Sequence, residues 1–201
     1  MTAAPDRLVL ASGSPRRSEL LAGLGLQFEI RPADIDESHP DFEPGQMYVG
    51  RLARAKAVAV ARAGEVVVAA DTTVDLDGEL LGKPADPDDA RVLLRRLSGR
   101  THLVHTGVCV HWATGSTPAV RSDVITTAVT FAELPDRWID WYAATGEPLD
   151  KAGGYGMQGS AALFVARIDG SPSNVIGLPL DTLAALVAEA GTDLFAFAPG
   201  P

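Results

Sequence analysis

The sequence predicts a mixed α/β or α+β fold of a single unit, because segments with helical and strand patterns alternate along its 201 residues. Two further observations favour this fold. A nearly continuous apolar run over 65–71 ends in a carboxylate and is typical of a strand buried on both faces. A short apolar run over 8–10 leads through small residues into a helical pattern, which indicates a strand, a loop and a helix in succession.

The first helix is predicted to begin after Ser14, a residue that suits the N-cap, with Pro15 in the first helical position. Leucines at helical spacing follow, and Gly25 is placed to end the helix. A second helix is predicted over 47–62, with Lys56 at the edge of its apolar face. The apolar stripe of this second helix is expected to comprise Tyr48, Leu52, Ala55 and Ala59.

The remaining elements follow from turn residues, helix caps and alternation of apolar and polar positions. In order, we expect a hairpin over 74–81 that turns at Asp77–Gly78, a helix over 84–97, strands over 102–112 and 120–131, a helix over 135–144, a Gly-rich loop over 147–160, a strand over 163–168 and a helix over 180–190. Residues 192–201 are expected to form a frayed tail.

Composition and charge restrict the partners. The hydrophobic fraction of 46% and the charged fraction of 21% are those of an ordinary globular protein. The net charge of −9 argues against a nucleic-acid partner and favours a compact anion such as a nucleotide. With Cys109 alone no internal disulfide can form, and neither a signal peptide nor an apolar run of about 20 residues is evident. We therefore expect a cytoplasmic protein with no membrane partner.

The first candidate binding segment is 12–17, with sequence SGSPRR. Ser12 and Ser14 allow close approach to a helix N-terminus, which offers free N–H groups and the positive end of a dipole. Arg16 and Arg17 add donors that match phosphate geometry. The alternative is a loop that carries two solvated arginines.

Asp71 and Thr72 follow the buried strand, where ligands gather in open α/β sheets. A carboxylate at this point can bind a metal or take a proton from water, or it can simply cap a turn. Lys83, held between glycine and proline, could reach a phosphate or lie on the surface. The loop over 147–160 is long enough to face a ligand, and Gln158 could read a base edge, unless the loop is only a connector.

Two possible metal sites differ in their support. Glu37, with Asp34 and Asp36, could hold Mg²⁺ or Mn²⁺ through oxygen ligands, although three close acids are more often a solvated loop. The three residues His105, Cys109 and His111 suggest zinc, but His105 and Cys109 would lie about 13 Å apart on a strand, too far to share one ion. We interpret them as ordinary strand residues.

In combination, these segments resemble the Maf family of nucleoside triphosphate pyrophosphatases. The matching stretches run from Leu8 to Leu180 in the order of the family: LVLASGSPRRSELL, DIDES, RLARAKA, VVAADTTV, GELLGKP, LSGRTHLVHTGV, GEPLDKAGGYGMQG and GSPSNVIGLPL. Each stretch alone is a weak signal, and eight in order are a strong one.

The resemblance implies a fold like that of inosine triphosphatase, in which helices flank a central mixed sheet and an active-site cleft lies between two lobes of one domain, 1–201. It also implies dependence on Mg²⁺ or Mn²⁺, and a homodimer. Asp71 matches the residue that activates water, and Arg16, Thr72 and Gln158 match residues that select the base. The other matched residues line the cleft, with the lysines expected on phosphates and the acids near metal or water: Glu37, Lys56, Lys83, Glu147 and Lys151.

Within the family, three positions favour the subgroup that hydrolyses dTTP and UTP. Arg16 follows Pro15 directly, Thr72 follows Asp71, and an amide stands at Gln158, which can both donate to and accept from a pyrimidine edge. The alternatives are a 7-methyl-GTP pyrophosphatase, or a non-enzymatic nucleotide-binding regulator of septum formation. Pro172, where an aromatic residue is common, and Asp75, which makes its strand more polar than usual, depart from the family pattern.

Overall fold

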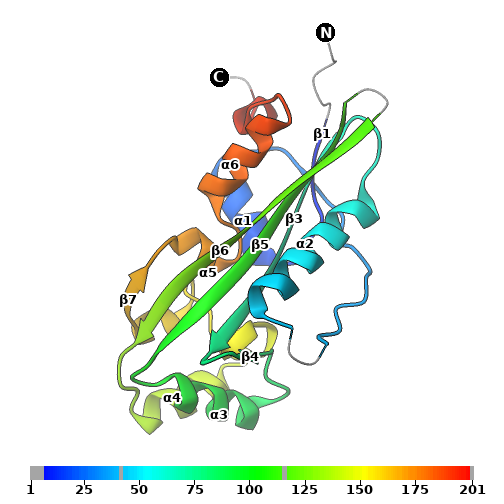
Figure 1. Ribbon diagram of the computed structural model, residues 1–201. Helices are drawn as coiled ribbons and strands as arrows, with labels where there is room; N and C mark the ends of the chain where they lie inside the picture. Colours follow the sequence, from blue (N-terminus) through cyan, green and yellow to red (C-terminus); the bar gives the residue numbers. More distant parts are fainter. Residues whose placement is uncertain (1–6, 41–42, 115–116, 200–201) are drawn as a thin grey trace. The chain divides into compact units, whose positions relative to one another are not determined.

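The computed structural model describes residues 7–40, 43–114 and 117–199, in which a seven-stranded mixed sheet is accompanied by six α-helices (Figure 1). The strand order is β2-β1-β3-β5-β6-β7, and β4 pairs with β3. The strands are β1 (Arg7–Leu10), β2 (Glu29–Ile30), β3 (Glu65–Leu76), β4 (Glu79–Leu81), β5 (Thr101–Thr114), β6 (Thr117–Phe131) and β7 (Val165–Asp169). The helices are α1 (Pro15–Gly23), α2 (Gly45–Val60), α3 (Pro87–Leu97), α4 (Asp136–Ala144), α5 (Pro172–Ile176) and α6 (Leu180–Glu189). This architecture confirms the predicted mixed α/β class.

Contacts along the chain divide it into two compact units. Unit 1 is formed by the described parts of Met1–Asp71, Thr106–Ile125 and Gly177–Pro201. Unit 2 is formed by Thr72–His105 and Thr126–Ile176. Three of the boundaries fall inside β3, β5 and β6, and the fourth follows the end of α5; Asp71 is the last residue of unit 1 on β3.

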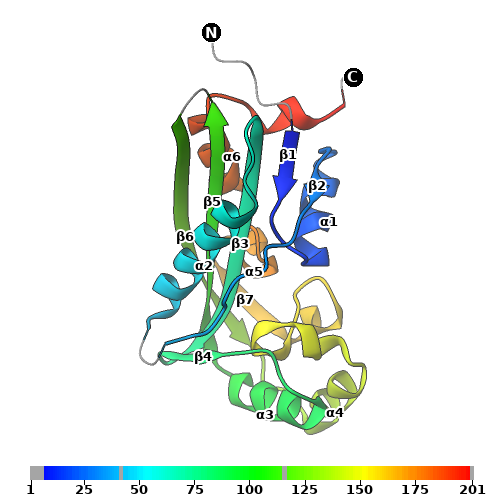
Figure 2. The ribbon, with the colours of Figure 1, turned by 90° about the vertical axis from the view of Figure 1, so that its right-hand side faces the viewer.

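Unit 1 has three layers, with helices on both sides of its strands (Figure 2). Alternate residues of β1, β3 and β5 pack on opposite faces. One face packs against α1 and α6, and its buried set includes Leu10, Val68, Val110, Leu21 and Leu183. The other face packs against α2, and its buried set is Val9, Ala11, Val67, Ala69, Cys109, Ala53 and Ala57. The apolar run of β3 is continuous because both of its faces are covered in this unit.

The parallel pairing of β1 with β3 positions the first candidate loop. Leu10 is in register with Val68, and the Ala11 N–H donates to the Val68 carbonyl over 2.7 Å. The carboxyl ends of parallel strands lie at the same edge of a sheet. The loop after β1 therefore begins beside the part of β3 that leads to Asp71.

The core of unit 2 is built on one hairpin and two helices. Asp77 and Gly78 form the β3–β4 turn with φ of 56° and 88°, as the Asp-Gly pair predicts. Asp86 caps α3 by accepting from the N–H groups of Asp88 and Asp89. The leucines of α3 pack with β5, β6 and α4 around Phe131 and Tyr155, whose rings lie 4.7 Å apart.

Three predicted details are wrong. The buried face of α2 comprises Val49, Leu52, Ala53, Lys56 and Ala57, so Lys56 lies within this face, whereas Ala59 is exposed. The C-terminal segment is not frayed over its described part. Leu194–Phe197 forms a 3₁₀ helix (η4) whose Leu194 and Phe197 are buried, and the Phe197 carbonyl accepts from the Gln27 N–H. The strand predicted over 65–71 does not end at Asp71 but continues to Leu76, so Asp71 and Thr72 lie inside β3. The predicted loop over 147–160 contains short 3₁₀ turns.

Candidate functional site

The hydroxyl group of Ser12 organises the loop between β1 and α1. Its Oγ accepts hydrogen bonds from the Ser14 N–H over 3.2 Å and from Arg17 Nη1 over 2.9 Å. Ser14 occupies the N-cap position of α1, and its side chain makes no capping hydrogen bond. Pro15 follows in the first turn, as predicted. The loop is thus shaped by Ser12, and the hydroxyl group of Ser14 is not used in capping.

Arg17 is fixed inside unit 1. It is only 9% exposed, and its Nε donates to the Gly177 carbonyl over 2.8 Å while Nη1 donates to Ser12. Burial lowers the pKa of the Arg17 guanidinium, and the nearby negative charge of Asp71 opposes this shift. Arg16, the neighbouring candidate, is half-buried. The two arginines therefore differ in burial and in contacts. Arg17 links the loop after β1 to Gly177, at the start of the C-terminal segment.

A lysine and two carboxylates meet in the middle of β3, at Asp71. Lys56 Nζ lies 2.6 Å from Asp71 Oδ1 and 2.7 Å from Glu37 Oε1. The Lys56 and Asp71 side chains are 10% and 12% exposed, and that of Glu37 is 50% exposed. We call these three residues the carboxylate–lysine cluster. A buried ammonium requires such partners, because removing it from water costs several kcal/mol.

The chain holds Glu37 through a set of contacts that the sequence did not predict. Tyr48 of α2 donates its hydroxyl hydrogen to the Glu37 carbonyl over 3.1 Å. Arg51, one turn further on, binds both carboxylate oxygens of Glu43 and the Ser38 carbonyl. The only sequence signal was the presence of polar side chains at helical spacing before Lys56. These contacts attach the acidic segment to the helix that carries the lysine.

The three acids of the segment 34–37 have different environments. Asp34 and Asp36 are exposed, and Asp36 accepts from the Ser38 N–H over 2.8 Å. That backbone hydrogen bond lowers the pKa of Asp36. Glu37 instead contacts Lys56. In the described parts of the chain no three His, Cys, Asp or Glu side chains are arranged to hold a metal ion.

In unit 2, the candidate loop over 147–160 is organised around Glu147. Its Oε1 accepts from the Tyr142 hydroxyl over 3.1 Å, and its Oε2 accepts from the Ser160 N–H over 3.3 Å. A Cβ atom at Gly159 would lie 2.0 Å from Glu147 Oε1, so glycine is needed here for the close approach. Burial, followed by the charge of Glu147, raises the pKa of Tyr142.

Lys151 completes this loop by binding back onto it. Its Nζ donates to the Glu147 carbonyl over 2.5 Å and to Asp150 Oδ1 over 2.6 Å. A Cβ atom at Gly156 would lie 2.5 Å from Lys151 Cε, so this glycine also makes room for a candidate side chain. Lys83 and Gln158 are exposed, and Thr72 is half-buried. Unit 2 therefore holds Glu147 and Lys151 in one ordered loop.

Two histidines of β5, His102 and His105, form hydrogen bonds within the sheet and its core. His102 Nε2 lies 2.7 Å from the Tyr155 hydroxyl, and burial lowers the pKa of this histidine to about 4. His105 Nδ1 lies 2.8 Å from the Thr126 hydroxyl. Burial also raises the pKa of the Cys109 thiol to about 11, which makes it a poor nucleophile.

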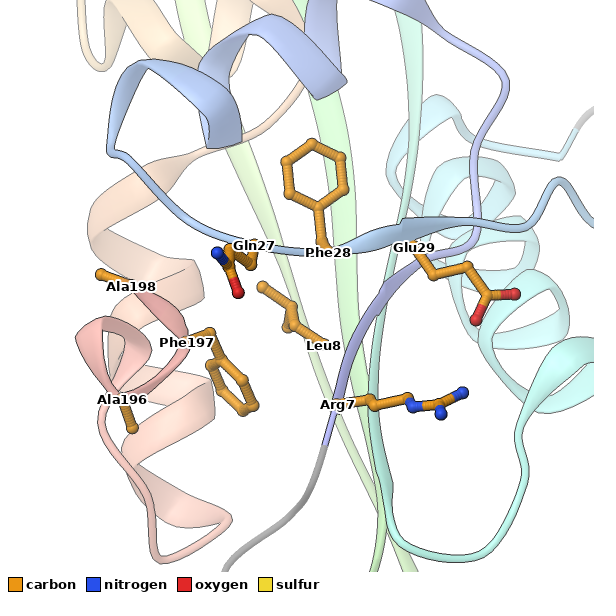
Figure 3. Close-up of a pocket in the computed structure, with 8 residues that line it drawn as sticks. All are labelled: Arg7, Leu8, Gln27, Phe28, Glu29, Ala196, Phe197 and Ala198. Carbon is orange, nitrogen blue, oxygen red and sulfur yellow. The ribbon is translucent and has the colours of Figure 1, made fainter. Parts of the chain in front are cut away.

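A pocket of about 460 Å³ lies elsewhere in unit 1 (Figure 3). Its lining comes from β1, the segment around β2, and η4: Arg7, Leu8, Gln27, Phe28, Glu29, Ala196, Phe197 and Ala198. Arg7 and Leu8 are at the start of β1, and the Ser12 loop follows the end of that strand. None of the candidate site residues lines this pocket.

The comparisons with known proteins agree with the motif pattern. Residues 7–190 match the family described as Maf-like protein. A protein of Anaeromyxobacter dehalogenans named dTTP/UTP pyrophosphatase is 57% identical over 188 residues, which cover 94% of this chain and 96% of the relative. A protein of Myxococcus xanthus with the same name is 52% identical, covering 96% of this chain and 97% of the relative.

A more distant relative extends this agreement. The dTTP/UTP pyrophosphatase of Exiguobacterium sibiricum is 50% identical over 177 residues, with 88% of this chain and 89% of the relative covered. Within the described residues, the helices are too short or too polar to cross a bilayer. Since the family match covers most of the chain and the relatives are similar along almost their whole length, this protein belongs to the Maf family.

Proposed function

We propose that this chain is a nucleoside triphosphate pyrophosphatase that hydrolyses dTTP and UTP to the monophosphate and pyrophosphate. The observation that carries the proposal is the carboxylate–lysine cluster, in which Asp71 ends the unit 1 part of β3 and contacts Lys56. The names of the relatives support the substrate class. The positions of Arg16, Thr72 and Gln158 in the motifs support the pyrimidine subgroup.

The donor set fits a divalent cation. Glu37 Oε1 and Asp71 Oδ1 both face one positive charge, that of Lys56. Proteins commonly bind Mg²⁺ through one or two carboxylates together with substrate phosphates, so Glu37 and Asp71 would hold it. When bound, such a cation neutralises phosphate charge and favours departure of pyrophosphate.

The residues of the chain then perform the reaction by positioning and proton transfer. Asp71 accepts a proton from water, and the water oxygen attacks the α-phosphorus. The bond between the α-phosphorus and the bridging oxygen breaks, and pyrophosphate leaves. Arg16 and Lys56 supply positive charge for the phosphates, while Ser12 and Arg17 hold the loop in shape. Phosphoryl transfer asks little covalent chemistry of the protein, so orientation and electrostatics supply most of the rate.

Unit 2 supplies the other residues that we assign by position in the motifs. Thr72 and Gln158 select the base, Lys83 and Lys151 bind phosphates, and Glu147 positions water or metal. The anchoring of Glu147 by Tyr142 and Ser160 supports a fixed role for its carboxylate. The expected homodimer, the cytoplasmic location and the preference for Mg²⁺ or Mn²⁺ stay predictions.

The test is pyrophosphate release from dTTP, UTP and 7-methyl-GTP, measured with Mg²⁺ and again after addition of EDTA. We expect dTTP and UTP to be the best substrates and EDTA to stop release. Asp71→Asn keeps the side-chain shape and removes the base, so kcat should fall by about 10² to 10⁴ while nucleotide still binds. Unchanged turnover in this variant, or a preference for 7-methyl-GTP, would overturn the corresponding part of the proposal.

A further inference from the structure

The carboxylate–lysine cluster contains fewer positive than negative charges. One ammonium, that of Lys56, contacts two carboxylates, Glu37 and Asp71. The two contacting oxygen atoms each lie within 2.7 Å of the same nitrogen, so they are less than twice that distance apart. Like charges at this separation repel each other strongly unless a cation lies near both.

The position of the Lys56 ammonium depends on its two carboxylate partners rather than on its aliphatic chain. The side chain extends from the buried face of α2, among Leu52, Ala53 and Ala57, and offers no acceptor of its own. Four methylene groups separate the charge from the backbone, so the ammonium can change partners without movement of the helix. Glu37 is on an exposed segment before α2, and its own side chain is half exposed. Solvent can therefore reach the cluster from the Glu37 side.

We propose that Lys56 acts as an internal substitute for the divalent cation. This inference rests on the proposed function and assigns a second role to one of its residues. In the metal-free protein the ammonium keeps Glu37 and Asp71 together and neutralises part of their charge. A divalent cation at the two carboxylates displaces the ammonium, because two positive charges compensate two carboxylates better than one does. The displaced ammonium is then available to the phosphates of the substrate.

Competition between Lys56 and the metal predicts an effect on metal affinity that a role in phosphate binding alone does not predict. If Lys56 competes for the carboxylates, its removal should strengthen metal binding in the absence of any nucleotide. If Lys56 only binds phosphate, its removal should affect metal affinity no more than the loss of any other positive charge on the same helix. Arg54 supplies that comparison, since it is an exposed residue of α2 two positions before Lys56.

The first experiment measures Mn²⁺ binding by calorimetry and by electron paramagnetic resonance, with no nucleotide present. We expect Lys56→Met to bind Mn²⁺ at least about tenfold more tightly than the unmodified protein, and Arg54→Met to differ by less than about twofold. Adding Asp71→Asn to Lys56→Met should abolish the gain, which assigns it to the cluster. Equal Mn²⁺ affinity in the Lys56→Met and Arg54→Met variants would overturn the proposal.

The second experiment follows the Lys56 ammonium in the unmodified protein by nuclear magnetic resonance, and a substitution serves only to identify its signal. In a ¹⁵N-lysine sample, the Lys56 ammonium should give a slowly exchanging signal, because two carboxylates hold its protons. Saturation with diamagnetic Mg²⁺ should shift this signal or remove it through exchange with water, and Lys56→Gln identifies the signal. A Lys56 signal that is unchanged at saturating Mg²⁺ would show that the ammonium stays in place, and the exchange would be wrong.

These measurements fail separately from the proposed function. If the chain does not release pyrophosphate but Mn²⁺ affinity still rises in Lys56→Met, then competition between Lys56 and the metal is supported and the proposed substrate is wrong. If pyrophosphate is released but the Lys56 signal does not change with Mg²⁺, then the proposed activity is supported and displacement of the ammonium by the metal is wrong.

Discussion

Acid should destabilise unit 2 through His102, which is buried in its core. His102 is 2% exposed, and its Nε2 lies 2.7 Å from the Tyr155 hydroxyl. Burial lowers the pKa of His102 from its usual 6.5 to about 4 in the folded protein. The unfolded chain therefore takes up a proton at a higher pH than the folded chain does. The contribution is fully favourable above pH 6.5 and is lost as the pH falls from 6.5 to about 4.

The size of this effect follows from the pKa difference. Each pH unit within that window costs about 1.4 kcal/mol, so the complete loss is about 3 kcal/mol. At pH 5 the loss relative to pH 8 is about 2 kcal/mol. His105 and His111 change stability in the same direction, because burial lowers the pKa of each.

The assay is urea unfolding at pH 8 and pH 5, followed by circular dichroism and by tryptophan fluorescence. Trp138 packs against the unit 2 core, so its emission reports on this part of the chain. The control is His102→Gln, which keeps a polar partner for Tyr155 but cannot titrate. The variant should lose about 2 kcal/mol less between the two pH values than the unmodified protein. If both proteins show the same difference in unfolding free energy, our reasoning about His102 is refuted.

Two other substitutions, the first with a matched control, test the candidate site and the stability of the fold separately. Gly159→Ala introduces a Cβ 2.0 Å from Glu147 Oε1, so the carboxylate must move; we expect kcat/KM for dTTP to fall at least about tenfold. Gly23→Ala, where a Cβ meets nothing within 4 Å, should not change it, and equal kinetics in both variants would contradict a role for the Glu147 position. Arg31→Met removes a partner of Glu65, a pair with 13% and 8% exposed side chains, and should lower the free energy of unfolding by about 3 kcal/mol with KM unchanged. Denaturation together with steady-state kinetics tests this, and a raised KM with intact stability would be the contrary result.

The elements that local chemistry determines were predictable from the sequence. The Asp77–Gly78 turn, the Asp-rich start of α3 and the two-sided burial of β3 each depend on residues adjacent in the chain. The two-residue strand β2 and the five-residue helix α5 were missed, because so short a segment shows no periodicity. They exist because neighbouring elements supply their partners, as β1 does for β2.

The phase of α2 was wrong for a different reason. Sequence reasoning placed the apolar residues Tyr48 and Ala59 on the buried face and Lys56 at its edge. In the fold, the helix is turned so that Lys56 points into the protein, where it meets Asp71, and Ala59 is exposed. An ion pair between residues 15 positions apart leaves no local signal, although it outweighs the preference of one alanine for the interior. The same holds for Arg17, whose partner Gly177 is 160 residues away.

The distribution of charge in unit 1 explains how a protein of net charge −9 can attract a triphosphate. Arg16, Arg17 and Lys56 carry three positive charges, and Glu37 and Asp71 carry two negative charges, so this group is positive by one. The electrostatic influence of Asp71 and Glu37 on Arg17 indicates that these charges act on one another. A divalent cation at the carboxylates would raise the local charge to plus three, which is enough to offset most of a triphosphate at short range. High salt should therefore weaken nucleotide binding less than the local attraction alone would suggest, because the attraction acts within a few ångströms, whereas salt also screens the repulsion from the global negative charge, which acts over a Debye length of about 10 Å.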